Sequence, residues 1–314
     1  MEKKAKIRPF SAAGQFYPED KKELEEELNR LMAESPSPRI NGEVFGLLLP
    51  HASYVFSGAV AALGVKAVEG NKFDTVIVLA DSHYEYFEGV SVWPEGEWET
   101  PLGKIEVDKE TAGKIISSSE RFVSRQSAHL FDHTIEVQLP LVQKALGRFK
   151  LVPIVIGSED RDWKKLAEAI FGIIKGKKVL IIASSDLSHY PPYEEAKKAD
   201  RAILKAIEGL DTEILDKNIA ELKKKNIPDA QTFLCSRDSV KALMEITRNF
   251  GGKARVLGYT NSGDLRGGKA RVVGYGSVAF FKEEGLAPEE KKELMDIAKP
   301  QWRALSGVNR LISS

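Results

Sequence analysis

Three of the five histidines in this 314-residue chain stand directly after apolar runs rich in valine, isoleucine and leucine. His51 follows EVFGLLLP, His83 follows DTVIVLADS, and His189 follows KVLIIASSDLS. Continuous apolar runs of this length are typical of the buried parallel strands of an α/β sheet. Ligands bind at the carboxyl ends of such strands, so we expect the three imidazoles to meet at one edge of a sheet.

Together with Asp186 and Cys235, these imidazoles supply the donor types of a transition-metal site. Two or three neutral imidazoles completed by a thiolate or a carboxylate suit iron, zinc or copper. Cys235 is the only cysteine, which excludes an internal disulfide and leaves its thiol free. Two other interpretations of these residues stay open. Asp186 is also a typical cap of a following helix, and a lone cysteine is often a small buried apolar residue.

The apolar runs alternate with helical patterns, which predicts the α/β fold class with a mostly parallel central sheet flanked by helices. An amphipathic helix is predicted at residues 21–32, and three long helical stretches between residues 194 and 250 are predicted to cover one face of the sheet. Residues 89–93 and 104–107 indicate a hairpin-like excursion from the main sheet. Further strands are predicted at residues 150–157, 254–260 and 271–281.

The composition argues against two classes of partner. Forty-six basic residues balance forty-six acidic ones, so no positive field draws the chain to nucleic acid or to an anionic membrane. No apolar stretch approaches the roughly 20 residues that span a bilayer, and the start MEKKAKIRPF lacks the apolar core of a signal peptide. We therefore expect a cytoplasmic protein. Abundant lysine and glutamate, with little glutamine, methionine and cysteine, indicate a thermophile.

A series of motifs in fixed order gives the sequence a family resemblance. Between Pro9 and Phe281 the chain contains AAGQFYPED, PHASYVFSG, TPLG, DHTIEVQLPLV, SSDLSHY, TFLCSRD and GYTNSGD followed by VVGYGSVAF. This order resembles the Memo family, whose prokaryotic members are called AmmeMemoRadiSam system protein B. Several separate motifs in one order are more specific than any single motif.

The resemblance implies a fold similar to the class III extradiol (LigB-like) dioxygenases, in which two histidines and a carboxylate hold iron at a sheet edge. In Memo proteins the corresponding cluster is histidine, histidine and cysteine. It therefore implies His51, His83 and Cys235 as metal ligands, with iron or copper as the metal and zinc as an alternative. It further implies that Asp186 and His189 line the same pocket as a catalytic pair, in which His189 moves protons and Asp186 orients its ring.

Other residues of the motifs receive more limited roles. His133 and Glu136 are three residues apart and share a predicted helix face. They are predicted to contact the metal ligands rather than the metal itself. His129 matches no motif position and is predicted to lie at the surface. The segment LADSH, which contains Asp81, stands where LGPSH or LGPNH is commoner in the family.

The domain prediction is one Memo-like α/β domain over residues 1–284 and a helical tail over residues 285–314. Three functions are compatible with the site residues. The first is a metal-dependent redox enzyme or oxygenase-like protein. The second is a non-catalytic adaptor that holds a metal, a small molecule or a peptide and works with radical-SAM and Ammecr-type proteins, the partners that the family name implies. The third is a zinc-dependent hydrolase.

Overall fold

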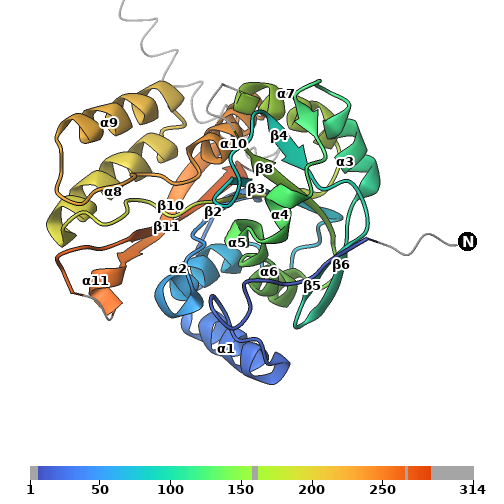
Figure 1. The fold of residues 1–314 in the computed structure, drawn as a ribbon, viewed down its shortest axis with the longest axis horizontal. Coiled ribbons are helices and arrows are strands. Elements are labelled where there is room, and N and C mark those ends of the chain that lie inside the picture. The colour runs from blue at the N-terminus through green and yellow to red at the C-terminus, as the bar shows by residue number, and fades with distance from the viewer. Residues whose placement is uncertain (1–5, 158–161, 266–267, 284–314) are drawn as a thin grey trace, which may run out of the picture. The chain divides into compact units, whose positions relative to one another are not determined.

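The structure, a computed structural model, describes residues 6–157, 162–265 and 268–283 (Figure 1). The helical tail predicted for residues 285–314 lies outside the described residues. The domain boundary predicted at residue 284 therefore stays a prediction.

Four parallel strands form the centre of the main sheet. In spatial order they are β2 (Glu43–Leu49), β9 (Val179–Ser184), β3 (Thr75–Asp81) and β8 (Lys150–Ile156). Nearly all of their residues are buried, as expected for strands that helices cover on both faces. The predicted fold class, α/β with a mostly parallel central sheet flanked by helices, is confirmed.

Other strands extend this sheet on both sides. β11 (Gly274–Lys282) pairs antiparallel with β2, and β10 (Lys253–Asn261) pairs antiparallel with β11. On the other side, β4 (Val90–Val92) pairs antiparallel with β8, and β7 (Phe122–Val123) pairs with β4. The prediction of an excursion is wrong for residues 89–93, because the buried strand β4 forms hydrogen bonds with β8. Residues 104–107 overlap a separate small sheet, which consists of β1 (Ile7–Arg8), β5 (Glu97–Thr100) and β6 (Gly103–Glu106).

Helices cover both faces of the main sheet. In β2, a Cβ atom at Gly46 would lie 2.8 Å from Leu243 of α10 (Arg237–Asn249), whereas Leu49 lies against Gly64 of α2 (Tyr54–Lys66). Residues three apart in a strand point to opposite faces, so α10 and α2 lie on opposite sides of the sheet. A Cβ atom at Gly64 would lie 2.4 Å from Leu49, so glycine lets α2 approach the sheet closely.

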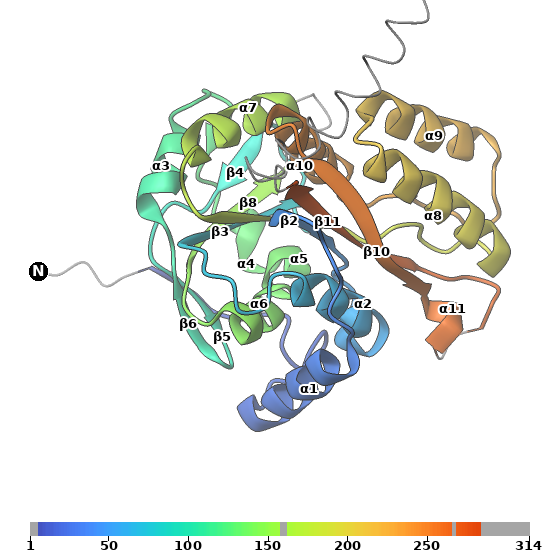
Figure 2. The same ribbon diagram turned by 180° about the vertical axis from the view of Figure 1, so that it is seen from behind.

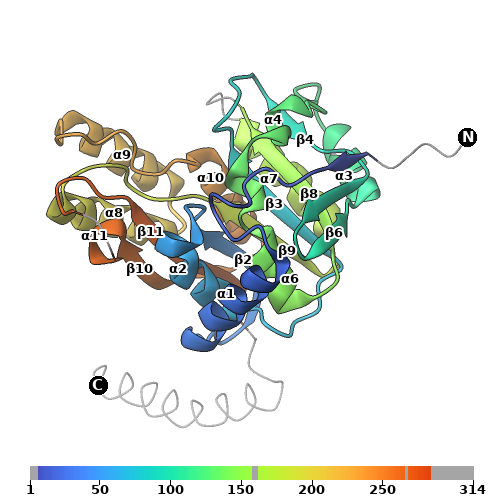
Figure 3. The ribbon, with the colours of Figure 1, turned by 60° about the horizontal axis from the view of Figure 1, so that its bottom comes forward.

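The predicted helical layer between residues 194 and 250 consists of α8 (Tyr193–Glu208), α9 (Thr212–Lys224) and α10. Seen from behind, α10 lies beside α7 (Asp162–Ile174), and α9 lies on α8 (Figure 2). On the other face, α1 (Lys21–Glu34) and α6 (Leu139–Leu146) lie beside α2 (Figure 3). Short helices complete the described chain: α3 (Lys109–Ile116), α4 (Ser127–Leu130), α5 (His133–Glu136) and α11 (Ser262–Leu265). Among the described residues, no helix has both the length and the apolar character needed to cross a membrane.

The order of the central strands places the predicted site. The chain passes from β2 to β3 and leaves a position between them that β9 later fills. The carboxyl ends of β2, β9 and β3 are therefore neighbours, and His51, His189 and His83 follow these three strands. Ligand sites of open α/β sheets form at this edge, where the direction of the connections changes.

Candidate metal centre

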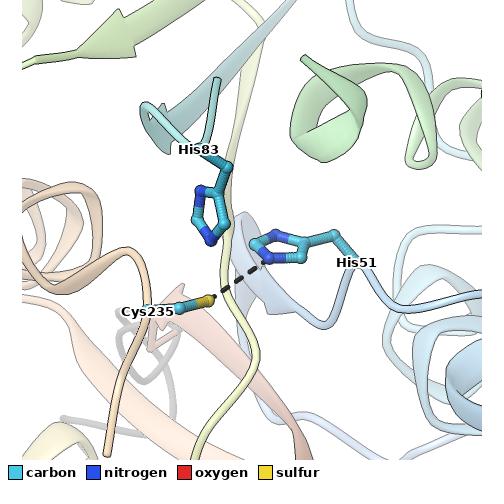
Figure 4. A group of neighbouring side chains, drawn as sticks. All are labelled: His51, His83 and Cys235. Carbon is cyan, nitrogen blue, oxygen red and sulfur yellow. Dashed lines mark hydrogen bonds between the residues drawn. The ribbon is translucent and has the colours of Figure 1, made fainter. Parts of the chain in front are cut away.

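Three side chains from distant parts of the sequence meet at this edge. His51 follows β2, His83 follows β3, and Cys235 lies in the loop that precedes α10. One ligand atom from each lies within 4.8 Å of the ligand atoms of the other two. Figure 4 shows the two imidazoles and the thiol pointing toward one another. The convergence that the sequence predicts for these residues is therefore present.

The hydrogen bonds of His51 direct one ring nitrogen toward Cys235. Its Nδ1 lies 3.1 Å from Ser184 Oγ, which donates its only proton to the Thr134 carbonyl and accepts a hydrogen bond from Gln138 Nε2. Since the Ser184 proton is already used, His51 Nδ1 must be the donor in their contact. The lone pair of His51 is then on Nε2, which lies 3.2 Å from Cys235 Sγ.

As Ser184 does for His51, a hydrogen bond to the last residue of β3 fixes the tautomer of His83. Its Nδ1 lies 2.8 Å from the carbonyl oxygen of Asp81, which is only an acceptor, so Nδ1 carries the proton. Its backbone N–H donates to Asp132 Oδ2 at 2.9 Å. The free lone pair of His83 is therefore on Nε2, as it is for histidine ligands whose other nitrogen binds a carbonyl or carboxylate.

Cys235 is partly buried and completes the group. Its Sγ accepts a hydrogen bond from the backbone N–H of Asp186 at 3.2 Å and lies 3.5 Å from Ser185 Oγ. Burial, and next the charge of Asp186, raise the pKa of the thiol. A thiolate at this position therefore needs a cation beside it, and a bound metal ion supplies one.

The protonation state of His51 suits the same conclusion. Burial lowers the pKa of His51 well below its ordinary value, and the neighbouring histidines lower it further. Burial also lowers the pKa of His133, to about 4. Neutral imidazoles with free lone pairs are metal ligands. The donor set of two imidazoles and one sulfur therefore fits a transition metal such as iron, copper or zinc.

His133 lies beside the two histidine ligands, whereas Glu136 binds a different segment. The His133 ring centre is 5.5 Å from that of His51 and 5.8 Å from that of His83, and its other side stacks on Phe16 at 4.2 Å. The Glu136 carboxylate is fully buried and forms an ion pair with Arg8. The hydrogen bonds of Glu136 thus run to the N-terminal segment.

The Asp186 carboxylate and the His189 ring do not form a bonded pair. The Asp186 carboxylate accepts hydrogen bonds from the backbone N–H groups of His51 at 2.8 Å and Ala52 at 3.3 Å. His189 Nδ1 instead lies 3.2 Å from the Leu187 carbonyl. The prediction that Asp186 orients the His189 ring is therefore wrong, because the tight loop after β2 brings two N–H donors to the Asp186 carboxylate.

His129 is also corrected, because it is fully buried rather than at the surface. Its ring packs edge-on against Trp93 and Trp98, whose ring centres are 5.8 and 6.0 Å away, and its Nε2 lies 2.9 Å from Ser91 Oγ. Burial lowers its pKa to about 3. It is a neutral core residue, and a single sequence offers no pattern that distinguishes it from an exposed histidine.

The roles of several supporting residues at the site were not predicted from the sequence. Ser184 fixes the tautomer of His51, Asp132 holds the backbone of His83, and Asp200 accepts the N–H of Ser188 at 2.9 Å, directly before His189. Their partners are 12 to 133 positions away along the chain. The polar run SSDLSH signalled a site, yet spacing alone could not say which carbonyl or amide each side chain binds.

Asp200→Asn is expected to flatten the dependence of stability on pH. Burial raises the pKa of Asp200 from 3.8 to about 7. Between these two pH values the folded state keeps a proton on Asp200 that the unfolded state releases. The contribution of this proton to the free energy of unfolding therefore falls as pH rises, by up to about 4 kcal/mol in total, and is lost above about pH 7. Asp200 also accepts the Tyr259 hydroxyl at 2.8 Å. Asparagine keeps an oxygen for the Ser188 N–H and offers an NH₂ group to the Tyr259 oxygen. Denaturant unfolding at pH 4, 6 and 8 measures the difference, and equal slopes for parent and variant would refute it.

Comparison with known proteins places the chain in a family. A family model described as Memo-like protein matches residues 8–279. A MEMO1 family protein of Nitrosopumilus maritimus is 34% identical over 281 residues, which cover 87% of this chain and 99% of the relative. One from Desulfurococcus amylolyticus is 36% identical over 294 residues, which cover 88% and 99%. The crystal structure of an uncharacterized protein from Escherichia coli K12 aligns with a TM-score of 0.49 at 14% identity, over 74% of this chain and 98% of that one. On the family match and the two relatives, the chain belongs to the Memo-like protein family.

Proposed function

We propose that this chain is a metal-dependent redox enzyme whose iron or copper ion is held by His51, His83 and Cys235. The observation that carries the proposal is the hydrogen-bond arrangement around the cluster. Both Nδ1 atoms are used as donors, and both Nε2 lone pairs remain beside one sulfur. A thiolate with two imidazoles is a softer donor set than two imidazoles with a carboxylate, which favours iron or copper.

The residues around the cluster have separate tasks in this proposal. Bound iron or copper would supply one-electron chemistry. Burial lowers the pKa of His189, and its Nδ1 proton is directed to the Leu187 carbonyl, so His189 Nε2 is free to accept a proton at neutral pH. Asp186 holds the loop of His51 through two backbone N–H groups and so fixes the position of that ligand.

A second function, an adaptor that binds a peptide or small molecule at the site, is favoured by one observation. Tyr84, Tyr86 and Phe131 are 59%, 87% and 62% exposed, and the rings of Tyr84 and Phe131 lie 5.3 Å apart. These aromatic side chains adjoin His83 and His133 in the sequence. Exposed aromatic side chains beside a site are typical of binding surfaces. Radical-SAM and Ammecr-type proteins are the proposed partners in this case.

Anaerobic purification, elemental analysis and an oxygen-consumption assay distinguish these functions. The redox proposal expects iron or copper in the protein, with oxygen consumed on addition of a reductant and less consumed by the His189→Ala variant. Bound zinc with ester hydrolysis and without oxygen consumption would favour the zinc-dependent hydrolase. Bound metal without turnover of oxygen or of hydrolysable esters would favour the adaptor and contradict the redox proposal.

Cys235→Ser is expected to weaken metal binding by at least about 100-fold. Loss of an outer hydrogen-bond partner of a ligand costs about 10- to 100-fold in affinity, and loss of the sulfur itself removes a soft ligand. Competition with a chromophoric chelator measures the affinity. Ser277→Ala is the matched control, because Ser277 Oγ lies in β11 and has no hydrogen-bond partner among the described residues. If Cys235→Ser binds metal as tightly as this control, sulfur is not a ligand.

A further inference from the structure

Asp81, the last residue of β3, connects the two loops that carry His83 and Cys235. Its carbonyl oxygen accepts the Nδ1 proton of His83 at 2.8 Å. Its carboxylate accepts the backbone N–H groups of Asp238 and Ser239, each at 3.0 Å, at the start of α10. The same carboxylate also accepts the Ser239 hydroxyl at 2.7 Å. One residue is therefore bonded to a metal-ligand ring and to the helix that begins just after the third ligand.

The carboxylate of Asp81 acts where α10 has no cap of its own. Ser236, at the N-cap position, forms no capping hydrogen bond with its side chain, and its buried Oγ has no partner among the described residues. The first N–H groups of a helix lack partners within the helix, and a negative charge near them is favourable. Asp81 supplies both the acceptor and the charge from a different strand.

This arrangement fixes the start of α10 relative to the end of β3. Cys235 precedes the helix by two residues, so its Sγ position depends on where α10 begins. The loop of Cys235 is also bonded to the residue that follows β9, because the Ser236 N–H donates to Ser185 Oγ at 3.0 Å. The Cys235 loop is therefore held from the end of β9, and the helix start that follows it is held by Asp81.

We propose that Asp81 is a positioning residue that sets the separation between His83 Nε2 and Cys235 Sγ and thereby raises metal affinity. The proposal rests on the metal site described under the proposed function. A purely structural cap would stabilise α10 without changing metal binding. Asp211 offers that comparison, since it caps α9 by accepting the N–H groups of Glu213 at 3.0 Å and Ile214 at 2.8 Å.

The test is a titration of metal-free protein with Co²⁺, which reports both affinity and the sulfur-to-metal charge-transfer band. Asp81→Asn keeps the size of the side chain but replaces one acceptor oxygen with an NH₂ group that faces N–H donors. It is expected to bind Co²⁺ about 10- to 100-fold more weakly, with a weakened or shifted charge-transfer band. Asp211→Ala is expected to lower the unfolding temperature while keeping the parent's affinity and band.

Ser239→Ala provides a milder change, because it removes only the hydroxyl donor and leaves the backbone bonds. We expect a smaller loss of Co²⁺ affinity than for Asp81→Asn. If Asp81→Asn does not fold, Ser239→Ala tests the role of Asp81 in its place. Parent-like affinity and band in folded Asp81→Asn, or in Ser239→Ala when only that variant folds, would overturn the role of Asp81. An equal loss of affinity in Asp211→Ala would also overturn it.

Failure of the metal site itself gives a different result. If the parent protein binds no Co²⁺, the proposed function fails, and hydrogen exchange of the metal-free proteins then tests the Asp81 connection alone. Faster exchange of the amides of Asp238 and Ser239 in Asp81→Asn than in Asp211→Ala supports the connection. Equal exchange in the two variants overturns it.

Discussion

Replacing both His51 and His83 by alanine is expected to abolish high-affinity metal binding while the fold is retained. Each ring supplies one free Nε2, and without both imidazoles only Cys235 remains of the ligand set. The sheet core consists of apolar residues of β2, β3, β8 and β9 and does not depend on ligands at its edge. Elemental analysis after dialysis against metal measures the content, and circular dichroism reports the fold.

His133→Ala is the matched control for the double variant. Its ring lies beside those of His51 and His83, yet the ligand group consists of His51, His83 and Cys235. The variant is therefore expected to keep its metal. Unchanged metal content in the double variant would contradict the proposed site. Loss of metal in His133→Ala would indicate that His133 is a ligand and that the ligand set is three imidazoles rather than two imidazoles and Cys235.

Replacing Arg8 by alanine is expected to destabilise the protein by about 3–5 kcal/mol, as is typical when one partner of a buried ion pair is removed. Arg8 and Glu136 are both fully buried and form an ion pair. The Arg8 guanidinium also donates to the carbonyl groups of His129 and Asp132, each at 2.9 Å, and lies 4.5 Å from the Trp98 ring centre. The variant leaves the Glu136 carboxylate buried without its cation. Denaturant unfolding at equilibrium measures the loss.

Lys114→Ala is the control for Arg8, because its ion pair with Glu110 is exposed and lies within one helix. Such pairs contribute about 0.3–0.5 kcal/mol. The Arg8 variant is also expected to bind metal more weakly, since Asp132, whose carbonyl Arg8 holds, accepts the backbone N–H of His83. A loss of less than about 1 kcal/mol for Arg8→Ala would show that the ion pair is not a main support of the N-terminal segment.

Hydrophobic pattern alone was enough to predict the central strands of the sheet and the edge at which His51 and His83 meet. The apolar runs before His51, His83 and His189 are buried parallel strands, because a strand covered on both faces must be apolar along its whole length. Cys235 is different, because it precedes a helix and follows no strand. Its thiol made Cys235 a candidate ligand, but only the family resemblance favoured it over Asp186 as the third ligand.

The pattern failed where a side chain's partner is distant in the sequence. Asp186 binds amides 134 and 135 positions away, and Glu136 binds a segment more than 100 positions away. Local spacing carries no information about such partners. It placed Glu136 with His133 on one helix face, yet the Glu136 carboxylate is held by Arg8 and the Ala12 N–H. The role of Asp81 likewise depends on the contact between β3 and α10, which only the folded chain creates.

X-ray absorption at the zinc edge tests the central claim most directly, with Zn²⁺ as a redox-silent probe of the ligand set. The His51, His83 and Cys235 site predicts one sulfur at about 2.3 Å and two imidazole nitrogens at about 2.0–2.1 Å from the metal. The sulfur contribution should disappear in Cys235→Ser, and the imidazole contribution should persist. A parent spectrum with nitrogen and oxygen neighbours only would contradict the claim that Cys235 and the two histidines form one metal centre.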